Sequence, residues 1–209
     1  MLTTLPNLLT LSRIIAVPLV VATFYVEPPV GPWSGCIIFA LAGFTDWLDG
    51  RLARAWQQQS AWGQFLDPIA DKVLVATTLL MLTATQRIAD WTVLPAVVIL
   101  AREILVSGLR EHLAEIRVKV PVSNLAKWKT ALQLIAIGVL LVGDAAPEIL
   151  HAKFLGAGLL WIAAALTLVT GYQYFRAGIV HVNVEETRRQ QAQNIKAGAM
   201  KAAKPSQAT

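Results

Sequence analysis

The stretch TDWLDGRLARAWQQQSAWGQFLDPIADK, residues 45–72, separates two long apolar runs and contains four of the 13 acidic residues of the chain. These four are Asp46, Asp49, Asp67 and Asp71. An aspartate well inside a lipid bilayer costs about 2.5–3.5 kcal/mol, even on the lenient scale derived from membrane insertion. If the apolar runs on either side cross a membrane, the energetic cost of placing four carboxylates there must be offset by an interaction that stabilises them.

The rest of the chain has the composition of a membrane protein. Of its 209 residues, 56% are hydrophobic and 15% are charged, and the mean hydropathy is +0.55. A transmembrane helix needs about 20 mostly apolar residues. We expect six such spans, and no sustained alternation of apolar and polar residues suggests strands, so we predict an all-α bundle of six transmembrane helices. The expected spans are residues 8–26, 32–49, 67–85, 91–113, 126–142 and 154–175.

The basic residues predict the orientation. With both termini in the cytoplasm, the inner loops and the inner tail hold nearly all of the lysines and arginines, whereas the outer loops hold only Arg87 and Lys153. This asymmetry is what the positive-inside rule describes. The pI of about 9.6 is explained by this topology and by contact with anionic membrane lipids, so we expect no nucleic-acid partner.

The expected connections between spans on the outer side are short, which favours one bundle. We therefore predict a single transmembrane domain over residues 1–180. Residues 181–209 form a polar, basic stretch rich in alanine, glutamine and lysine, with no apolar face to anchor it. We expect this C-terminal tail to be flexible.

The spacing of the four aspartates brings them to one place. Asp46 and Asp49 are three positions apart at the end of the second expected span, and Asp67 and Asp71 are four apart at the start of the third. Both spacings put side chains on one face of a helix. Because the two helices run antiparallel around a cytoplasmic loop, we expect all four carboxylates to face one another at the inner surface of the membrane.

Two explanations compete for this acidic cluster. The four acids can be paired separately with cations or reach water at the helix ends, but Arg54 and Lys72 can neutralise two carboxylates at most. Divalent cations supply the missing charge, and a site made only of oxygen ligands suits Mg²⁺ or Mn²⁺. We therefore predict a metal site.

The residues between the acids suggest that a bulky anion approaches here. Gly50 directly follows Asp49, although glycine inside a helix costs roughly 0.5–1 kcal/mol relative to alanine. Ala53 is similarly small, and the guanidinium of Arg54 can hold a phosphate through two parallel hydrogen bonds. Gly63 lies one helical turn before Asp67 and is equally consistent with an ordinary loop glycine.

These residues form a pattern of eight positions that resembles the signature of the CDP-alcohol phosphatidyltransferases at every position. The pattern is Asp46-x2-Asp49-Gly50-x2-Ala53-Arg54-x8-Gly63-x3-Asp67-x3-Asp71. Known members of this family are six-helix integral membrane enzymes, usually dimeric, so the resemblance implies a homodimer. It also implies that the four aspartates bind two divalent ions and that Asp71 is the general base.

The resemblance assigns further residues to the CDP moiety. It implies that Gly50, Ala53 and Arg54 contact CDP, as does Gly63 within the same signature. Ser60 occupies a place where members often carry a hydroxyl near the nucleotide. Two more polar residues lie three positions apart in the first expected span and can also face the nucleotide, although helix capping and headgroup contact explain them equally well; these are Asn7 and Thr10.

Four other stretches resemble one branch of the family, the bacterial phosphatidylglycerophosphate synthases. They are residues 5–20, 65–76, 100–111 and 127–133. This resemblance implies an enzyme of the bacterial cytoplasmic membrane, with its active site on the cytoplasmic side. An alcohol would attack the lipid-bearing phosphate of CDP-diacylglycerol and CMP would leave. The implied acceptor is sn-glycerol 3-phosphate; serine, inositol phosphate and phosphatidylglycerol are alternatives within the same chemistry.

A different class of function, a divalent-cation transporter, would also cluster acids in a membrane. A transport path needs polar residues across the bilayer. Here the acids gather on the inner side, and residues 156–169 are almost wholly apolar. The sequence therefore favours the enzyme.

An acceptor that carries a phosphate needs a second anion site. The candidates are Arg102 in the fourth expected span, and Arg110 and Lys127 near the inner ends of the fourth and fifth. Lys129 is two residues beyond Lys127 and is expected to point to a different face. Glu103 is the alternative partner of Arg102, but adjacent positions on a helix do not face each other.

Overall fold

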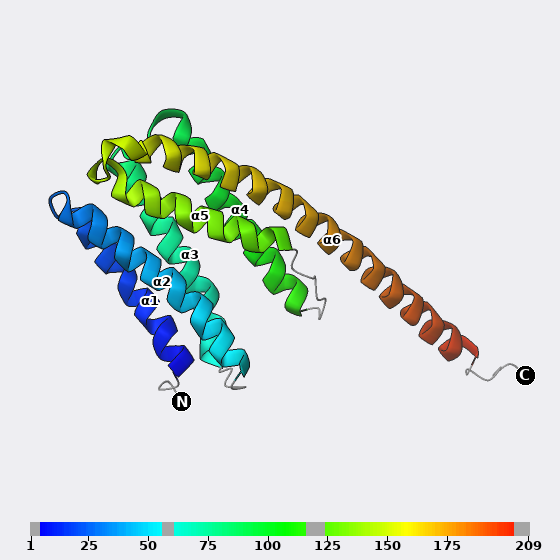
Figure 1. Ribbon diagram of the computed structural model, residues 1–209. Helices are drawn as coiled ribbons and strands as arrows, with labels where there is room; N and C mark the ends of the chain where they lie inside the picture. The colour runs from blue at the N-terminus through cyan, green and yellow to red at the C-terminus, as the bar shows by residue number, and fades with distance from the viewer. Residues whose placement is uncertain (1–4, 56–60, 116–123, 203–209) are drawn as a thin grey trace, which may run out of the picture.

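The computed structural model describes residues 5–55, 61–115 and 124–202 (Figure 1). Within these ranges every regular element is helical, so the predicted all-α class is confirmed. The α-helices are α1 (Leu5–Thr23), α2 (Val30–Ala55), α3 (Ala61–Ala84), α4 (Val93–Glu115), α5 (Asn124–Val142) and α6 (Ala152–Ala202). Short 3-10 turns lie in the connections: η1 (Asp90–Thr92), η2 (Gly143–Ala145) and η3 (Glu148–Leu150).

Three described helical stretches are long and apolar enough to cross a membrane. They are Asp90–Glu111, Lys127–Ala145 and Glu148–Arg176, and Leu8–Thr23 is a shorter apolar helix. The described residues form six α-helices, the same number as the expected spans. That all six helices cross the membrane stays a prediction, because α2 and α3 also carry the charged stretch.

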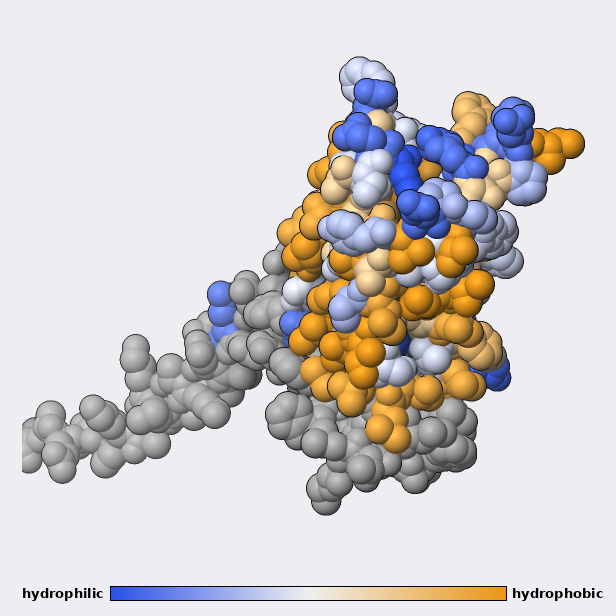
Figure 2. Space-filling view, turned by 90° about the vertical axis from the view of Figure 1, so that its left-hand side faces the viewer, coloured by the Kyte–Doolittle hydropathy of each residue, from blue (hydrophilic) through white to orange (hydrophobic). Residues whose placement is uncertain are grey.

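The outer surfaces of the helices are apolar even where the helices carry charged residues elsewhere. On α1, Leu11, Ile15 and Leu19 are exposed, and on α2 so are Ile37 and Leu41. Figure 2 shows a broad apolar surface over the body of the molecule, with polar residues gathered at one end. Soluble monomers rarely expose apolar patches beyond a few hundred Å², so this surface is suited to lipid.

The helices pack around a shared apolar core. α1 lies against both α2 and α3, α2 also contacts α5, and α6 packs against α5 and α4. Gly31 makes the turn from α1 into α2 possible, because a β-carbon there would lie 2.2 Å from the carbonyl oxygen of Val26. α1 therefore packs against the two helices that carry the four aspartates of the sequence pattern.

One arginine joins three segments at the end of the bundle opposite the aspartates. Arg87 donates a hydrogen bond to the carbonyl oxygen of Leu141 at 2.5 Å, and its guanidinium lies over the ring of Phe24, 5.1 Å from the centroid. Burial lowers the pKa of Arg87, and the nearby carboxylate of Asp144 opposes that change. This contact holds the ends of α1, α3 and α5 together.

α6 is much longer than a membrane crossing requires. It runs without interruption for 51 residues, about 75 Å at a rise of 1.5 Å per residue, and extends past the other helices (Figure 1). Helical backbone therefore continues through most of the expected tail at 181–209. Alanine, glutamine, lysine and arginine are good helix formers, which explains the continuation; the flexibility of the tail stays a prediction.

Candidate functional site

The structure brings Asp46 of α2 and Asp67 of α3 together on one buried arginine of α1. The two terminal nitrogens of Arg13 contact these carboxylates, one nitrogen bonding Asp46 Oδ1 and the other bonding Asp67 Oδ1 at 3.1 Å. The Arg13 side chain is only 1% exposed, whereas those of Asp46 and Asp67 are 45% and 43% exposed. The guanidinium therefore approaches the carboxylates from inside the bundle.

Thr10 supports the same arrangement. It lies on α1 one turn before Arg13, is buried, and donates its hydroxyl to Asp67 Oδ1. In this structure Thr10 therefore contacts a carboxylate of the acidic cluster. Its sequence-based assignment to the nucleotide stays a prediction.

Asp71 lies one turn beyond Asp67 on α3 and is half-buried. Its carboxylate lies within electrostatic range of Asp46, Glu103 of α4, Arg13 and Lys72. Lys72 also donates a hydrogen bond to the hydroxyl of Ser107 on α4. Asp71 thus lies between the aspartate cluster and the charged residues of α4.

Several predicted site residues fall outside what the structure describes. Ser60 lies outside the described ranges, and Gly63 is buried on α3. The surroundings of the remaining predicted residues of α1 and α2 also lie outside the description; these are Asn7, Asp49, Gly50, Ala53 and Arg54.

The described part of the acidic cluster has the chemistry of a hard-cation site. Among the described residues, no three histidine, cysteine, aspartate or glutamate side chains converge closely enough to form a metal centre. Asp46 and Asp67 nevertheless already share one cation, the Arg13 guanidinium. Carboxylate oxygens are the ligands that Mg²⁺ and Mn²⁺ prefer, so this donor set fits such ions.

A second charged cluster lies between α4, α5 and α6. Lys129 is 3% exposed and bonds the Glu103 carboxylate. Arg102 approaches the same carboxylate at 3.3 Å and donates to the Thr170 hydroxyl at 3.1 Å. Gly171 leaves room for this arginine, because a β-carbon there would lie 3.2 Å from Arg102 Cγ. Two cations therefore share the single carboxylate of Glu103.

The structure separates the three residues predicted to bind the acceptor phosphate into one that is largely buried and two that are exposed. Arg102 is largely buried, but Arg110 and Lys127 are exposed. Lys129, which we expected on a different face from Lys127, is the lysine that is buried. Arg102 also pairs with the adjacent Glu103, contrary to our expectation for neighbouring helix positions, and Lys129 meets the same carboxylate from α5.

Two residues of these clusters were missed, and each had a signal in the sequence. Arg13 interrupts an apolar run, and charged residues in such runs usually face the bundle interior with a partner. Lys129 is four positions before Gln133 and therefore shares its helix face. Both Lys129 and Gln133 are buried, so the spacing of this polar pair indicated which face of α5 packs against the other helices.

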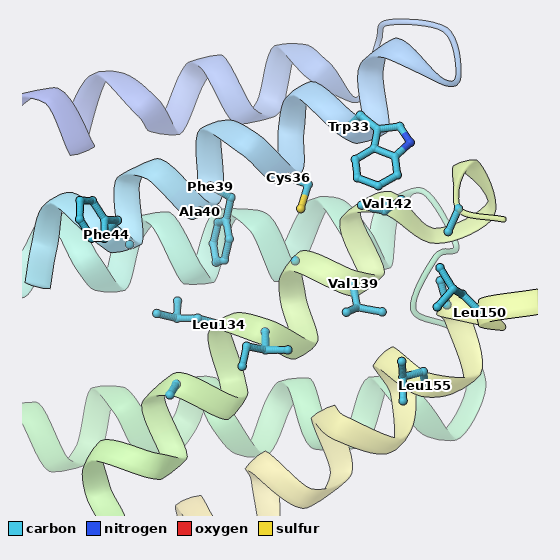
Figure 3. Close-up of a pocket in the computed structure, with 16 residues that line it drawn as sticks. Trp33, Cys36, Phe39, Ala40, Phe44, Leu134, Val139, Val142, Leu150 and Leu155 are labelled. Carbon is cyan, nitrogen blue, oxygen red and sulfur yellow. The ribbon is translucent and has the colours of Figure 1, made fainter.

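An apolar groove lies between α2, α5 and the start of α6 (Figure 3). Its volume is about 650 Å³, and apolar side chains dominate its lining. It follows α2 from Trp33 to Phe44, and Leu134 and Val139 of α5 face it. Phe44 is two residues before Asp46 in α2, so the groove reaches the part of α2 that carries this aspartate.

Comparison with known proteins gives consistent results. The family model described as CDP-alcohol phosphatidyltransferase matches residues 3–169. Three similar proteins share the name CDP-diacylglycerol–glycerol-3-phosphate 3-phosphatidyltransferase. The Rickettsia bellii protein is 47% identical over 173 residues, covering 83% of this chain and 94% of its own. The Shigella flexneri protein is 43% identical over 175 residues (83% and 93%), and the Cereibacter sphaeroides protein is 36% identical over 217 residues (87% and 98%).

Proposed function

Because the chain belongs to the CDP-alcohol phosphatidyltransferase family, we propose that it transfers the phosphatidyl group from CDP-diacylglycerol to sn-glycerol 3-phosphate. The products are phosphatidylglycerophosphate and CMP, and the reaction serves phospholipid biosynthesis. The observation that carries this proposal is the agreement of relatives that share one name and match over most of both chains.

The four aspartates are proposed to hold two divalent cations, Mg²⁺ or Mn²⁺. Support comes from the oxygen-only donor set and from the cation that Asp46 and Asp67 already share. Such ions supply countercharge to a diphosphate and stabilise the leaving oxygen. Around them, Gly50 and Ala53 would let the CDP moiety approach the backbone of α2, and Arg54 would bind a phosphate oxygen.

Asp71 is the proposed general base. It would take the proton of the acceptor hydroxyl as that oxygen bonds to phosphorus and the bond from phosphorus to the CMP oxygen breaks. Asp71 suits this role because it lies within electrostatic range of Asp46 and also of Glu103 and Lys129. It therefore adjoins both the proposed diphosphate site and the second cluster.

The second cluster is proposed to bind the acceptor phosphate. Arg102 and Lys129 together exceed the charge of Glu103, and both are largely buried, which strengthens their attraction for an anion. An acceptor phosphate distinguishes glycerol 3-phosphate from serine. Arg110 and Lys127 are exposed in this structure and remain candidates from the sequence alone.

The membrane arrangement is also proposed. The exposed apolar side chains on α1 and α2 support six crossings, and the distribution of lysine and arginine supports cytoplasmic termini. The active site would then lie on the cytoplasmic side of a bacterial inner membrane. There the lipid donor stays in the bilayer while the soluble acceptor arrives from the cytoplasm. The protein would act as a homodimer, as the resemblance to the family implies.

One assay tests the reaction and its acceptor together. The purified protein in detergent would be given CDP-diacylglycerol, Mg²⁺ or Mn²⁺, and one of four acceptors: glycerol 3-phosphate, serine, inositol phosphate or phosphatidylglycerol. We expect CMP release with glycerol 3-phosphate and loss of release after chelation of the metal. Release only with another acceptor would overturn the assignment of the acceptor, and no release with any acceptor would overturn the proposed reaction.

A further inference from the structure

We propose that Arg13 is a positioning residue for the metal site: it fixes the carboxylates of Asp46 and Asp67 from inside the bundle and leaves their outward sides ready for a divalent cation. This inference rests on the metal site proposed above. It adds a residue of α1 that lies outside the signature of eight positions.

The burial of Arg13 shows that it belongs to the site. It is among the largest fully buried side chains of the described residues. A buried charge that loses its partner costs about 3–5 kcal/mol, so the Arg13 guanidinium needs the two carboxylates. α1 packs against both α2 and α3, which lets one planar side chain reach an aspartate on each helix. A lysine ammonium, as a point charge, lacks this fork.

The contacts are one-sided on each carboxylate. Arg13 bonds Oδ1 of Asp46 and Oδ1 of Asp67, and Thr10 bonds the same oxygen of Asp67. Both aspartate side chains remain nearly half exposed. Among the described residues, donors of α1 therefore hold one oxygen of each carboxylate, while the side chains of Asp46 and Asp67 keep 45% and 43% of their surface exposed, respectively. Partners of this kind fix the direction in which a ligand presents its remaining oxygen.

If Arg13 acted only through its charge, it would weaken the binding of a divalent cation. A positive group next to a cation site repels the cation, so removal of the Arg13 charge without any loss of orientation would tighten metal binding. If orientation dominates, its loss weakens metal binding, by about 10–100-fold for partners behind metal ligands. The sign of the change in metal affinity therefore separates a positioning role from a passive countercharge.

The test measures Mn²⁺ binding to the full-length protein in detergent without substrates, by electron paramagnetic resonance of free Mn²⁺. The variants are Arg13→Lys, which keeps the charge, and Arg13→Gln, which removes it. Arg87→Gln is the matched control, because Arg87 is a partly buried arginine at the opposite end of the bundle. The thermal midpoint of each protein, with and without Mn²⁺, is recorded in parallel.

We expect both Arg13 variants to bind Mn²⁺ about 10–100-fold more weakly and to show a smaller rise in thermal midpoint with Mn²⁺. Arg87→Gln should lower the midpoint but keep the wild-type Mn²⁺ affinity. Unchanged or tighter Mn²⁺ binding by Arg13→Lys or Arg13→Gln overturns the positioning role. If Arg13→Gln does not fold, the Mn²⁺ affinity of Arg13→Lys decides between the two roles. Absence of Mn²⁺ binding by the wild-type protein would instead overturn the metal site itself.

Discussion

Asp71 is the residue on which the proposed chemistry depends most directly. We expect Asp71→Asn to lower kcat by at least about 10²–10⁴-fold, the usual contribution of a general base. The asparagine keeps the size of the side chain, so CDP-diacylglycerol binding should largely remain. Steady-state CMP release and equilibrium binding of a CDP-lipid, measured on the same preparation, check this expectation. Wild-type turnover in the variant would remove Asp71 from the role of base.

Lys129 and Lys127 provide a second test at the scale of single residues. We expect Lys129→Gln to lower kcat/KM for glycerol 3-phosphate by about 10–100-fold, because a charged hydrogen bond is worth about 1.5–3 kcal/mol. Lys127→Gln tests the candidate chosen from sequence, and its effect should be smaller because that side chain is exposed. Saturation curves for glycerol 3-phosphate at fixed CDP-diacylglycerol measure both. A larger effect at Lys127 would restore the sequence-based choice.

These residues show why only part of the candidate site was predictable. The aspartates could be found because helical spacing places each pair on one face and because membranes penalise isolated charges. Partners on other helices could not be assigned in this way. That Arg13 meets Asp46 and Asp67 depends on how α1 packs, and that Lys129 meets Glu103 depends on the rotation of α5 about its axis.

At the scale of helices, the groove between α2 and α5 runs along α2 toward the end of that helix that carries Asp46. From Phe44 back to Trp33 the groove follows α2 for 11 positions, about 16 Å at 1.5 Å per residue. This is about half of a 30 Å hydrocarbon core. We infer that an acyl chain of the lipid donor lies there while its diphosphate reaches the aspartates.

Gly138 allows a direct test of this inference. A β-carbon at Gly138 would lie 3.7 Å from Cys36 Sγ, an ordinary contact, so Gly138→Ala should behave like the wild-type protein. Gly138→Leu would fill part of the groove, and we expect it to raise KM for long-chain CDP-diacylglycerol but not for a short-chain analogue. Kinetics with donors of two chain lengths measure the difference. An equal effect on both donors would argue against an acyl chain in the groove.

For the whole molecule, the fold was largely predictable because lipid imposes strong constraints. Helices must satisfy their own backbone hydrogen bonds in a bilayer, so long apolar runs identified the helices and their order. The helix ends were less well predicted. α2 runs to Ala55 and α6 to Ala202, because polar residues with good helical propensity extend each helix beyond its apolar part.

The orientation of the whole bundle can be tested with single cysteines. Cys36 is the only cysteine of the chain, so Cys36→Ala provides a background into which Glu148→Cys or Gln190→Cys is introduced. Both positions are exposed. We expect a membrane-impermeant maleimide to label residue 148 in intact spheroplasts and residue 190 only after permeabilisation. The reverse pattern would place the aspartate cluster on the outer side.

The burial of Arg13 also has a consequence for biogenesis. A chain threaded into the membrane from its N-terminus presents α1 first, with its arginine still lacking Asp46 and Asp67. An arginine inside a span adds an insertion cost, which reaches about 2.5–3.5 kcal/mol at the centre of the span, so α1 enters lipid less readily before its aspartate partners are present. The two helices that carry Asp46 and Asp67 of the proposed active site also supply the charges that α1 needs. The first three helices should therefore leave the translocation channel as one unit, so the aspartates of the proposed active site would also contribute to the insertion of the protein.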